Sequence, residues 1–132
     1  MVVVSVKGCG VDLVEISRIE RALKRRRFRE TIYTSQEQDS LKDKGAQSWA
    51  ARFAAKEAVM KAIGLGWQQG VPFGAIDIYT NSAGQPQVRL LEPALSVANQ
   101  LGVHRFVLSL THTKELAMAY VIALGEDEGC RL

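Results

Sequence analysis

The chain of 132 residues is poor in cysteine: it has two, Cys9 and Cys130, near its opposite ends. A structural zinc site or a disulfide framework needs more cysteines, so we expect two reduced thiols. Any apolar run near the roughly 20 residues of a membrane-spanning helix is also absent. The opening, MVVVSVKGCG, has no basic head and no small-residue cleavage site, so it predicts a strand rather than a signal peptide. We therefore expect a cytoplasmic protein without membrane contact.

Several common catalytic signatures are missing as well. The sequence has no GxSxG, no HExxH, no GxxxxGK phosphate loop and no dinucleotide fingerprint, which argues against the enzyme classes that carry them. What remains is an ordinary globular composition, 47% hydrophobic and 23% charged. This balance and the length predict one compact domain over residues 1–132.

Helix and strand patterns alternate irregularly, which predicts an α+β fold. Valine-rich or alternating segments predict strands at 2–11, 75–80, 87–91, 105–110 and 116–124. The turn-forming NSAGQP joins the second and third of these strands into a hairpin. Gly8 and Gly10 interrupt the first strand, where a glycine allows a bend or a close approach by another segment.

Helices are expected between these strands. Ser17 and Thr34 are each followed three residues later by glutamate, the capping-box pattern, so we expect a helix from each. The first should run to about Arg27, with a second short turn at 28–32, and the helix after Thr34 should run toward residue 44. The longest is expected over 46–63, where alanine is abundant, and a shorter one over 93–102.

Two acidic residues are candidates for chemistry. Asp12 lies in an apolar strand, where a carboxylate is costly to bury without a partner, although it could also face solvent or cap a turn. Glu57 shares a helix face with Phe53 and Met60, although Lys61, four residues on, could simply pair with it at the surface. Taken together, the two acids predict a magnesium-type site completed by water and phosphate, with Lys61 reaching the same phosphate.

His112 stands in SLTHTKE at the expected end of a strand. It could be an ordinary hydrogen-bonded histidine, or it could contact phosphate together with the hydroxyls of Thr111 and Thr113 and with Lys114. The sequence alone leaves both interpretations open.

Arginines gather on the segment that follows Asp12. Arg18, Arg21 and Arg25 are three and four residues apart and form one stripe of a helix. Such a stripe is often a solvated face, but its place beside Asp12 favours docking of an acidic partner. Two other functions remain open: a small basic nucleic-acid-binding domain, which lacks interleaved aromatics here, and a structural module that oligomerises through the alanine-rich helix.

Three segments, GCGVDLVEISRI, WAARFAAKEAVMKAIG and SLTHTKELAMAYVIA, together resemble the holo-acyl-carrier-protein synthases, the short bacterial type of 4′-phosphopantetheinyl transferase. The resemblance covers nearly the whole chain. It implies an antiparallel sheet with one long alanine-rich helix packed on it. It also implies a magnesium-dependent transferase of fatty acid biosynthesis, which moves phosphopantetheine from coenzyme A to a serine of an apo acyl carrier protein and releases 3′,5′-ADP. The family's short members are homotrimers with active sites between subunits.

The resemblance also assigns roles to residues. Asp12 and Glu57 would bind magnesium, and Lys61 would contact the coenzyme A phosphates. The serine proton would go to Glu57 or to a metal-bound water polarised by Asp12. His112, with Thr111, would lie near the adenosine end and its 3′-phosphate and would come from the neighbouring subunit. Arg52 and the turn at 81–86 are weaker candidates for coenzyme contacts.

The partner side follows from the same resemblance. Arg18, with Arg21 and Arg25 on the basic helix, would dock the acidic helix of the carrier protein. Two positions depart from the family pattern. Cys9 replaces an aliphatic residue, and Val14 stands where larger relatives have a third acidic ligand, so that water would complete the metal sphere. Glu15 would point to the opposite face of the strand.

Overall fold

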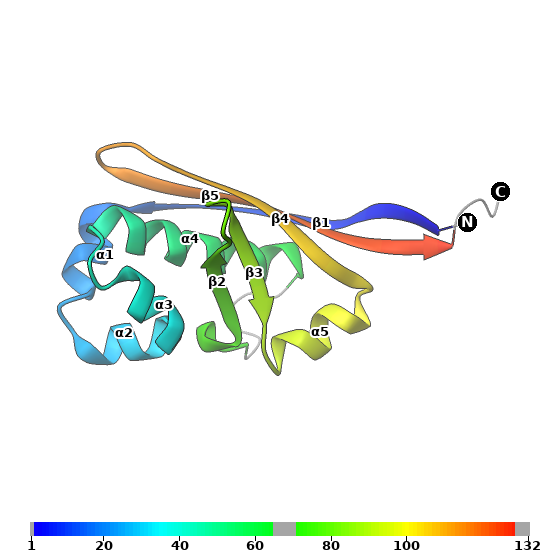
Figure 1. Cartoon of the computed structure of the whole chain (residues 1–132), viewed down its shortest axis with the longest axis horizontal. Helices are drawn as coiled ribbons and strands as arrows, with labels where there is room; N and C mark the ends of the chain where they lie inside the picture. The colour runs from blue at the N-terminus through cyan, green and yellow to red at the C-terminus, as the bar shows by residue number, and fades with distance from the viewer. Residues whose placement is uncertain (1, 65–70, 129–132) are drawn as a thin grey trace.

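The computed structural model describes residues 2–64 and 71–128 and shows an α+β arrangement, as expected (Figure 1). Two antiparallel sheets are present in this part of the chain. One has three strands in the order β1-β5-β4, and the other is the hairpin β2-β3. The elements follow in the order β1 Val2–Glu15, α1 Ile16–Ala22, α2 Arg26–Ile32, α3 Ser35–Leu41, α4 Ala46–Ala62, the 3-10 turn Phe73–Ala75, β2 Ile76–Thr80, β3 Pro86–Leu90, α5 Ala94–Gln100, β4 Val103–His112 and β5 Leu116–Glu128.

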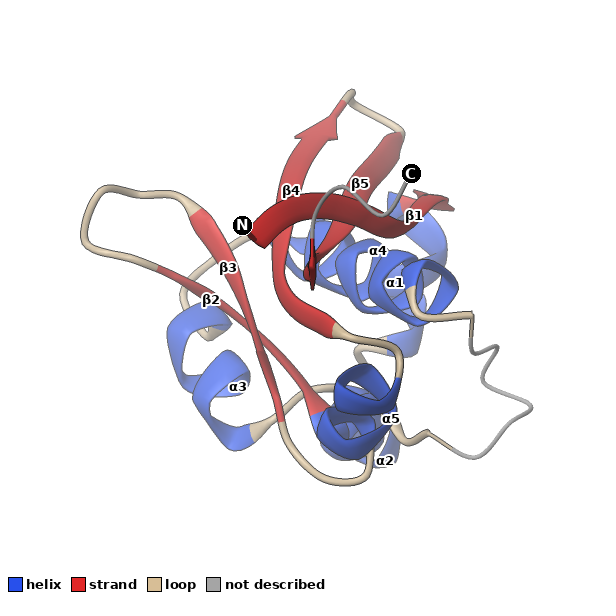
Figure 2. Ribbon diagram, turned by 90° about the vertical axis from the view of Figure 1, so that its right-hand side faces the viewer, coloured by secondary structure: helices blue, strands red, loops and turns tan. Residues whose placement is uncertain are grey.

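Helix α4 lies along one face of the three-stranded sheet, between that sheet and helices α2 and α3 (Figures 1 and 2). Alanine lets these layers approach closely: the core contains fully buried alanines from both sides of the contact, namely Ala54, Ala55 and Ala58 of α4 and Ala117, Ala119 and Ala123 of β5. The long alanine-rich helix on an antiparallel sheet is thus confirmed.

Gly8 and Gly10 occupy the place where β1 crosses α4. A Cβ atom on Gly8 would overlap the carbonyl oxygen of Ala62, and one on Gly10 would overlap that of Ala58. The close approach expected from these glycines is therefore real, and its partner is the long helix. At the end of α4, Gly64 has a φ of 75°, which is the left-handed conformation that a helix C-terminus favours.

The segment after β1 differs from the expectation. Ser17 does not cap a helix, because α1 already begins at Ile16 with Glu15 as its N-cap. The helix expected to reach about Arg27 ends at Ala22, because the chain leaves the helical path at residues 23–25, and the short turn expected at 28–32 belongs to α2, which already starts at Arg26. The Arg29 guanidinium donates to the Leu23 carbonyl at this break. The other capping box is confirmed: Thr34 and Glu37 exchange both bonds, although α3 ends at Leu41.

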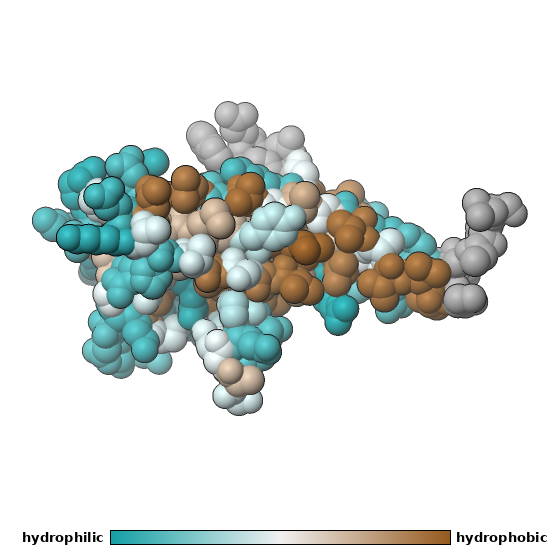
Figure 3. All heavy atoms as spheres, turned by 90° about the horizontal axis from the view of Figure 1, so that it is seen from above, coloured by the Kyte–Doolittle hydropathy of each residue, from teal (hydrophilic) through white to brown (hydrophobic). Residues whose placement is uncertain are grey.

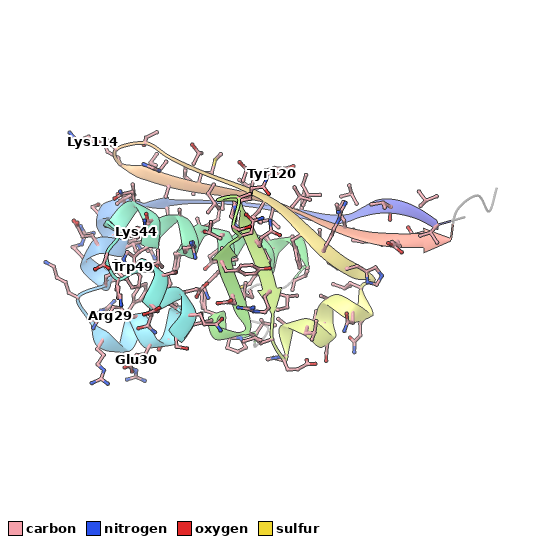
Figure 4. The ribbon with its side chains drawn as sticks, viewed as in Figure 1. Arg29, Glu30, Lys44, Trp49, Lys114 and Tyr120 are labelled. Carbon is pink, nitrogen blue, oxygen red and sulfur yellow. The ribbon has the colours of Figure 1, made fainter. Side chains whose placement is uncertain are left out.

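The other face of the three-stranded sheet, here called the outer face, is apolar and uncovered. Its register places Val11 opposite Tyr120 and Leu13 opposite Met118, and all four side chains are exposed. Figure 4 shows Tyr120 on the side of the sheet away from α4, and Figure 3, which looks onto this side, shows a hydrophobic band along it. None of the helices in the described residues is both long and apolar enough to cross a bilayer.

Candidate active site

Asp12 lies on the inner face of β1, and Lys61 reaches it from the last turn of α4. The Lys61 Nζ is 3.3 Å from Asp12 Oδ1 and donates to the Val11 carbonyl oxygen at 2.9 Å. Partial burial raises the pKa of the Asp12 carboxyl, and the Lys61 ammonium opposes that rise. The Asp12 carboxylate is therefore held beside the Lys61 ammonium. Lys61 lies one helical turn beyond Glu57 on α4.

Glu57 faces the same region from the preceding turn of α4. Its side chain is half-buried, and burial is the largest reason that its pKa is raised; the nearby negative charge of Asp12 raises it further. Lys61 and Arg18 both lower the pKa of Glu57, and both also lower that of Asp12. The structure thus brings Asp12, Glu57, Lys61 and Arg18 into one electrostatic cluster, although they come from β1, α4 and α1.

The donor set of this cluster fits a hard divalent cation. Burial raises the pKa of both half-buried carboxylates, and repulsion from Asp12 raises that of Glu57 further. A cation bound by both would stabilise their ionised forms. Within the described residues, no group of three or more acidic, histidine or cysteine side chains lies together. Val14 is buried against the core and Glu15 is exposed on the opposite side, so neither adds a ligand. Water and phosphate oxygens would have to complete the coordination sphere.

Arg52 and His112 line a second region, a cavity of about 370 Å³ between α4, the β2–β3 hairpin and β4. Thr80, Gly84 and Pro86 belong to the same lining, so the hairpin turn takes part as well. Arg52 is held in place by two bonds, from Nη1 to the Ile78 carbonyl oxygen and from Nη2 to Thr80 Oγ1 at 3.0 Å.

Thr111 does not share this cavity. It pairs with Met118 on the outer face, whereas His112 pairs with Ala117, so the two neighbours point to opposite sides of β4. The cavity lining also does not include Asp12 or Glu57. Arg52 and Glu57 are five residues apart on α4, which places them about 140° apart around its axis. Within one chain, the carboxylates and the Arg52–His112 cavity therefore open on different sides of the helix.

The three arginines of the basic stripe meet despite the break between α1 and α2. Arg18, Arg21 and Arg25 line a hollow of about 310 Å³ together with two aromatic rings, Phe28 and Phe53. Those rings stack with their centroids 6.2 Å apart. The hollow combines cationic walls with an apolar floor, which suits an acidic partner that also carries an apolar side chain.

The sequence did not reveal the buried ion pair of Lys56 and Glu37. Both side chains are fully buried, with Nζ and Oε1 2.6 Å apart. Lys56 also donates to the carbonyl oxygens of Phe73, at 3.0 Å, and of Ile76, and Glu37 Oε2 accepts from the Ile78 amide at 2.7 Å. The pair ties α3, α4 and β2 together. Because Lys56 immediately precedes Glu57, it fixes the rotation of α4 and hence the side on which Glu57 stands.

Known proteins that are similar to this chain come from one enzyme family. The family model described as "4′-phosphopantetheinyl transferase superfamily" matches residues 8–123. Among curated proteins, the holo-[acyl-carrier-protein] synthase of Solibacter usitatus is 44% identical over 119 residues, which is 87% of this chain and 95% of that protein.

Solved structures are similar as well. A Helicobacter pylori holo-[acyl-carrier-protein] synthase in complex with coenzyme A has a TM-score of 0.78 and 30% identity, covering 87% of this chain and 98% of that one. A holo-(acyl-carrier-protein) synthase from Bacillus anthracis in complex with coenzyme A (3′,5′-ADP) has a TM-score of 0.76 and 34% identity, covering 91% and 97%.

Proposed function

The chain belongs to the holo-[acyl-carrier-protein] synthases of the 4′-phosphopantetheinyl transferase superfamily, and from this premise we propose that it transfers 4′-phosphopantetheine from coenzyme A to a serine of an apo acyl carrier protein. Membership in this enzyme family sets aside the nucleic-acid-binding and purely structural alternatives. The observation that carries the assignment of the site is the convergence of Asp12 and Glu57, forty-five positions apart in the sequence, on one cluster with Lys61.

In the proposed reaction, the serine oxygen bonds to the pantetheine-side phosphorus of coenzyme A. The bond from that phosphorus to the bridging oxygen of the pyrophosphate breaks, and 3′,5′-ADP leaves with the electron pair. The serine proton needs an acceptor, and either the Glu57 carboxylate or a water polarised beside Asp12 would serve. Lys61 places a positive group beside the pyrophosphate, so the catalysis is mainly positioning and electrostatic stabilisation.

Asp12 and Glu57 would hold magnesium, which when bound would neutralise negative charge on the pyrophosphate. Lys61 then has two tasks: it donates to the Val11 carbonyl, which orients its side chain, and it shields Asp12 while no cation is present. Arg18, whose charge acts on both carboxylates, adds positive potential at the entrance from α1.

The coenzyme would span two subunits. Arg52 and His112 are suited to the 3′-phosphate and adenosine, but their cavity opens on a different side of α4 from the carboxylates. A neighbouring copy can supply the missing half, and the uncovered outer face, with Val11, Leu13 and Tyr120 exposed, offers it a contact surface. These two features support a homotrimer with active sites between subunits. Thr111, on the outer face, would then lie at this contact.

The acyl carrier protein would dock on the hollow of Arg18, Arg21 and Arg25. The arginine charges attract an acidic helix and set its approach, and the floor of Phe28 and Phe53 offers burial for one apolar side chain. The attacking serine would thereby reach the carboxylate cluster that Arg18 adjoins.

The direct test is mass spectrometry of an apo acyl carrier protein after incubation with the enzyme, coenzyme A and magnesium. We expect the carrier mass to rise by one phosphopantetheine group and 3′,5′-ADP to appear. Glu57→Gln should lose this activity, while Glu92→Gln should keep it; Glu92 lies just before α5, and the amide oxygen of glutamine can still accept from Ser96 Oγ. An unchanged rate for Glu57→Gln would show that its carboxylate has no role in the reaction.

A further inference from the structure

Side chains of α4 form hydrogen bonds with one edge of β2, the strand of the hairpin that lies nearer to α3 (Figure 1). Lys56 donates to the Ile76 carbonyl oxygen. Arg52, one turn earlier on the helix, donates to the Ile78 carbonyl oxygen. Four residues of a helix rise about 6 Å and two residues of a strand rise about 6.6 Å, so successive turns of α4 meet alternate carbonyls of β2. The helix thereby takes the place of a further strand along this edge.

Thr80 ends this row of contacts. It follows Ile78 by two residues, so both side chains lie on the same face of β2. One turn before Arg52 on α4 stands Ser48, whose short side chain shows no bond to β2 within the described residues. The Thr80 hydroxyl instead accepts from Arg52 Nη2 at 3.0 Å. The cavity of about 370 Å³ begins at this point, because Ser48, Arg52 and Thr80 all line it.

Within the described part of the chain, Arg52 lacks the carboxylate partner that the neighbouring cations have. Glu37 is paired with Lys56 at 2.6 Å. Asp77 is paired with Arg89, also at 2.6 Å. The bonds of Arg52 go to a carbonyl and a hydroxyl oxygen, and burial lowers the pKa of its guanidinium although Glu37 and Asp77 oppose that change. A half-buried cation without a carboxylate partner, at the wall of a cavity, favours an anionic ligand there.

The two bonds of Arg52 fix the plane of its guanidinium. The Ile78 carbonyl holds Nη1 and the Thr80 hydroxyl holds Nη2, whereas a single bond would leave the group free to turn. Arginine presents its donors in a planar fork that matches the oxygens of a phosphate. The donors of Arg52 that these two bonds leave over therefore have a set direction at the cavity wall.

We propose that Thr80 is a positioning residue, whose hydroxyl orients the Arg52 guanidinium so that the cavity selects a nucleotide with a phosphate on the 3′ oxygen of its ribose. The proposal rests on the proposed function, in which Arg52 takes that phosphate of coenzyme A, and it adds the residue that sets the geometry. Thr80 acts through Arg52 and does not itself contact the nucleotide. Without the hydroxyl, only the Ile78 carbonyl would hold the guanidinium, and the fork would no longer be fixed against the phosphate.

The test compares two nucleotides that differ only in this phosphate, 3′,5′-ADP and 5′-AMP. Calorimetry gives Kd for each. The ratio of the 5′-AMP value to the 3′,5′-ADP value, here called the 3′ selectivity, measures what the phosphate contributes. Thr80→Val removes the hydroxyl but keeps a β-branched side chain that suits a strand. Thr80→Ser keeps the hydroxyl, and Thr31→Val, at an exposed position of α2, is the matched control.

We expect Thr80→Val to lower the 3′ selectivity by a factor of about three to ten, the effect of one misplaced hydrogen bond, while its affinity for 5′-AMP changes little. Thr80→Ser should restore most of the selectivity, and Thr31→Val should leave it at the wild-type value. In the transfer reaction, Thr80→Val should raise KM for coenzyme A by a similar factor and leave kcat nearly unchanged. A wild type without 3′ selectivity, a Thr80→Val variant that matches the wild type, or a Thr80→Ser variant that matches Thr80→Val would overturn the proposal.

An Arg52→Ala background separates positioning from direct contact. There the 3′ selectivity should already be low, and the addition of Thr80→Val should not lower it further. A further loss would mean that Thr80 contacts the nucleotide itself, which refutes the positioning role.

Urea unfolding distinguishes positioning from support of the fold. The midpoint of Thr80→Val should stay within about 0.5 M of the wild type. A larger fall, together with an equal loss of affinity for both nucleotides, would identify a purely structural role and count against the proposal. The binding measurements use no carrier protein, so failure of the proposed transfer would be seen separately, in the carrier-mass assay on the wild type.

Discussion

Replacement of Lys56 by methionine tests the buried pair that positions α4. Methionine keeps the length and packing of the lysine stem but removes the cation, so the Glu37 carboxylate loses its 2.6 Å partner while staying fully buried. Glu37 keeps only the amide donors of Thr34, at 2.8 Å, and Ile78, at 2.7 Å. A buried charge that loses its counter-ion is among the costliest single changes in a protein.

The expected loss is about 3–5 kcal/mol, the range for breaking one side of a buried pair. That is a large part of the roughly 5–15 kcal/mol by which a domain is stable. With a urea m value of about 2 kcal/mol/M, the unfolding midpoint should fall by about 2 M. Lys42→Met is the matched control, because Lys42 forms an exposed pair with Asp39 at 3.4 Å; its loss should stay below about 1 kcal/mol.

The pH dependence gives an independent check. Burial already raises the pKa of Glu37, and Lys56 opposes that rise, so the variant should have a still higher Glu37 pKa. A group whose folded pKa lies above its unfolded value contributes stability at low pH and loses it as the pH rises through the folded pKa. The gap between wild type and Lys56→Met in urea unfolding should therefore narrow as the pH is lowered toward about 5. A loss below about 1 kcal/mol, or a gap that widens at low pH, would refute the reasoning.

Three further predictions concern the site and its scaffold. Burial raises the pKa of both Asp12 and Glu57 in the metal-free protein, and both must be ionised to hold a cation, so the affinity for magnesium should begin to fall at a higher pH than the value of about 4 for an ordinary carboxylate; an affinity that stays flat down to that pH contradicts this. Arg21→Glu should raise KM for the carrier protein much more than KM for coenzyme A, and added salt should weaken carrier binding to the wild type; equal effects on both KM values count against the docking surface. Gly10→Ala should cost about 1–3 kcal/mol in urea unfolding because its Cβ meets the Ala58 carbonyl, whereas Gly74→Ala, with open space around it, should be nearly neutral.

The parts of the fold that could be predicted depend on local chemistry. The capping box of Thr34 and Glu37, the alanine-rich helix and the hairpin after Thr80 each need only a few neighbouring residues to form. The break at residues 23–25 has no such local cause, since neither glycine nor proline stands there. The break instead accompanies tertiary packing: Ile19 of α1 and Ile32 of α2, on either side of it, are both buried in the core.

The site was predictable as a set of residue types, but its geometry was not. The pattern around Phe53 pointed to Glu57 as the inward residue of the long helix, yet Lys56 is the one that is fully buried. Neighbouring helical residues differ by about 100° around the axis, so a sequence pattern cannot decide between them when most other residues are alanine. Glu37, which forms the buried ion pair with Lys56, lies on a different helix. Its side chain already had a role in the capping box of α3, so nothing in the sequence pattern indicated the second contact with Lys56.

The glycines that let β1 touch α4 have a consequence for the choice of ion. Asp12 follows Gly10 on the strand, and Glu57 precedes Ala58, whose carbonyl faces that glycine. The strand and the helix that carry the two carboxylates are therefore held at a close backbone distance next to both residues. Calcium takes six to eight oxygen ligands at about 2.3–2.6 Å, whereas magnesium needs about 2.0–2.1 Å. We expect this close contact of β1 with α4 to make the site select ions by their radius. It should bind magnesium and reject calcium even when calcium is abundant.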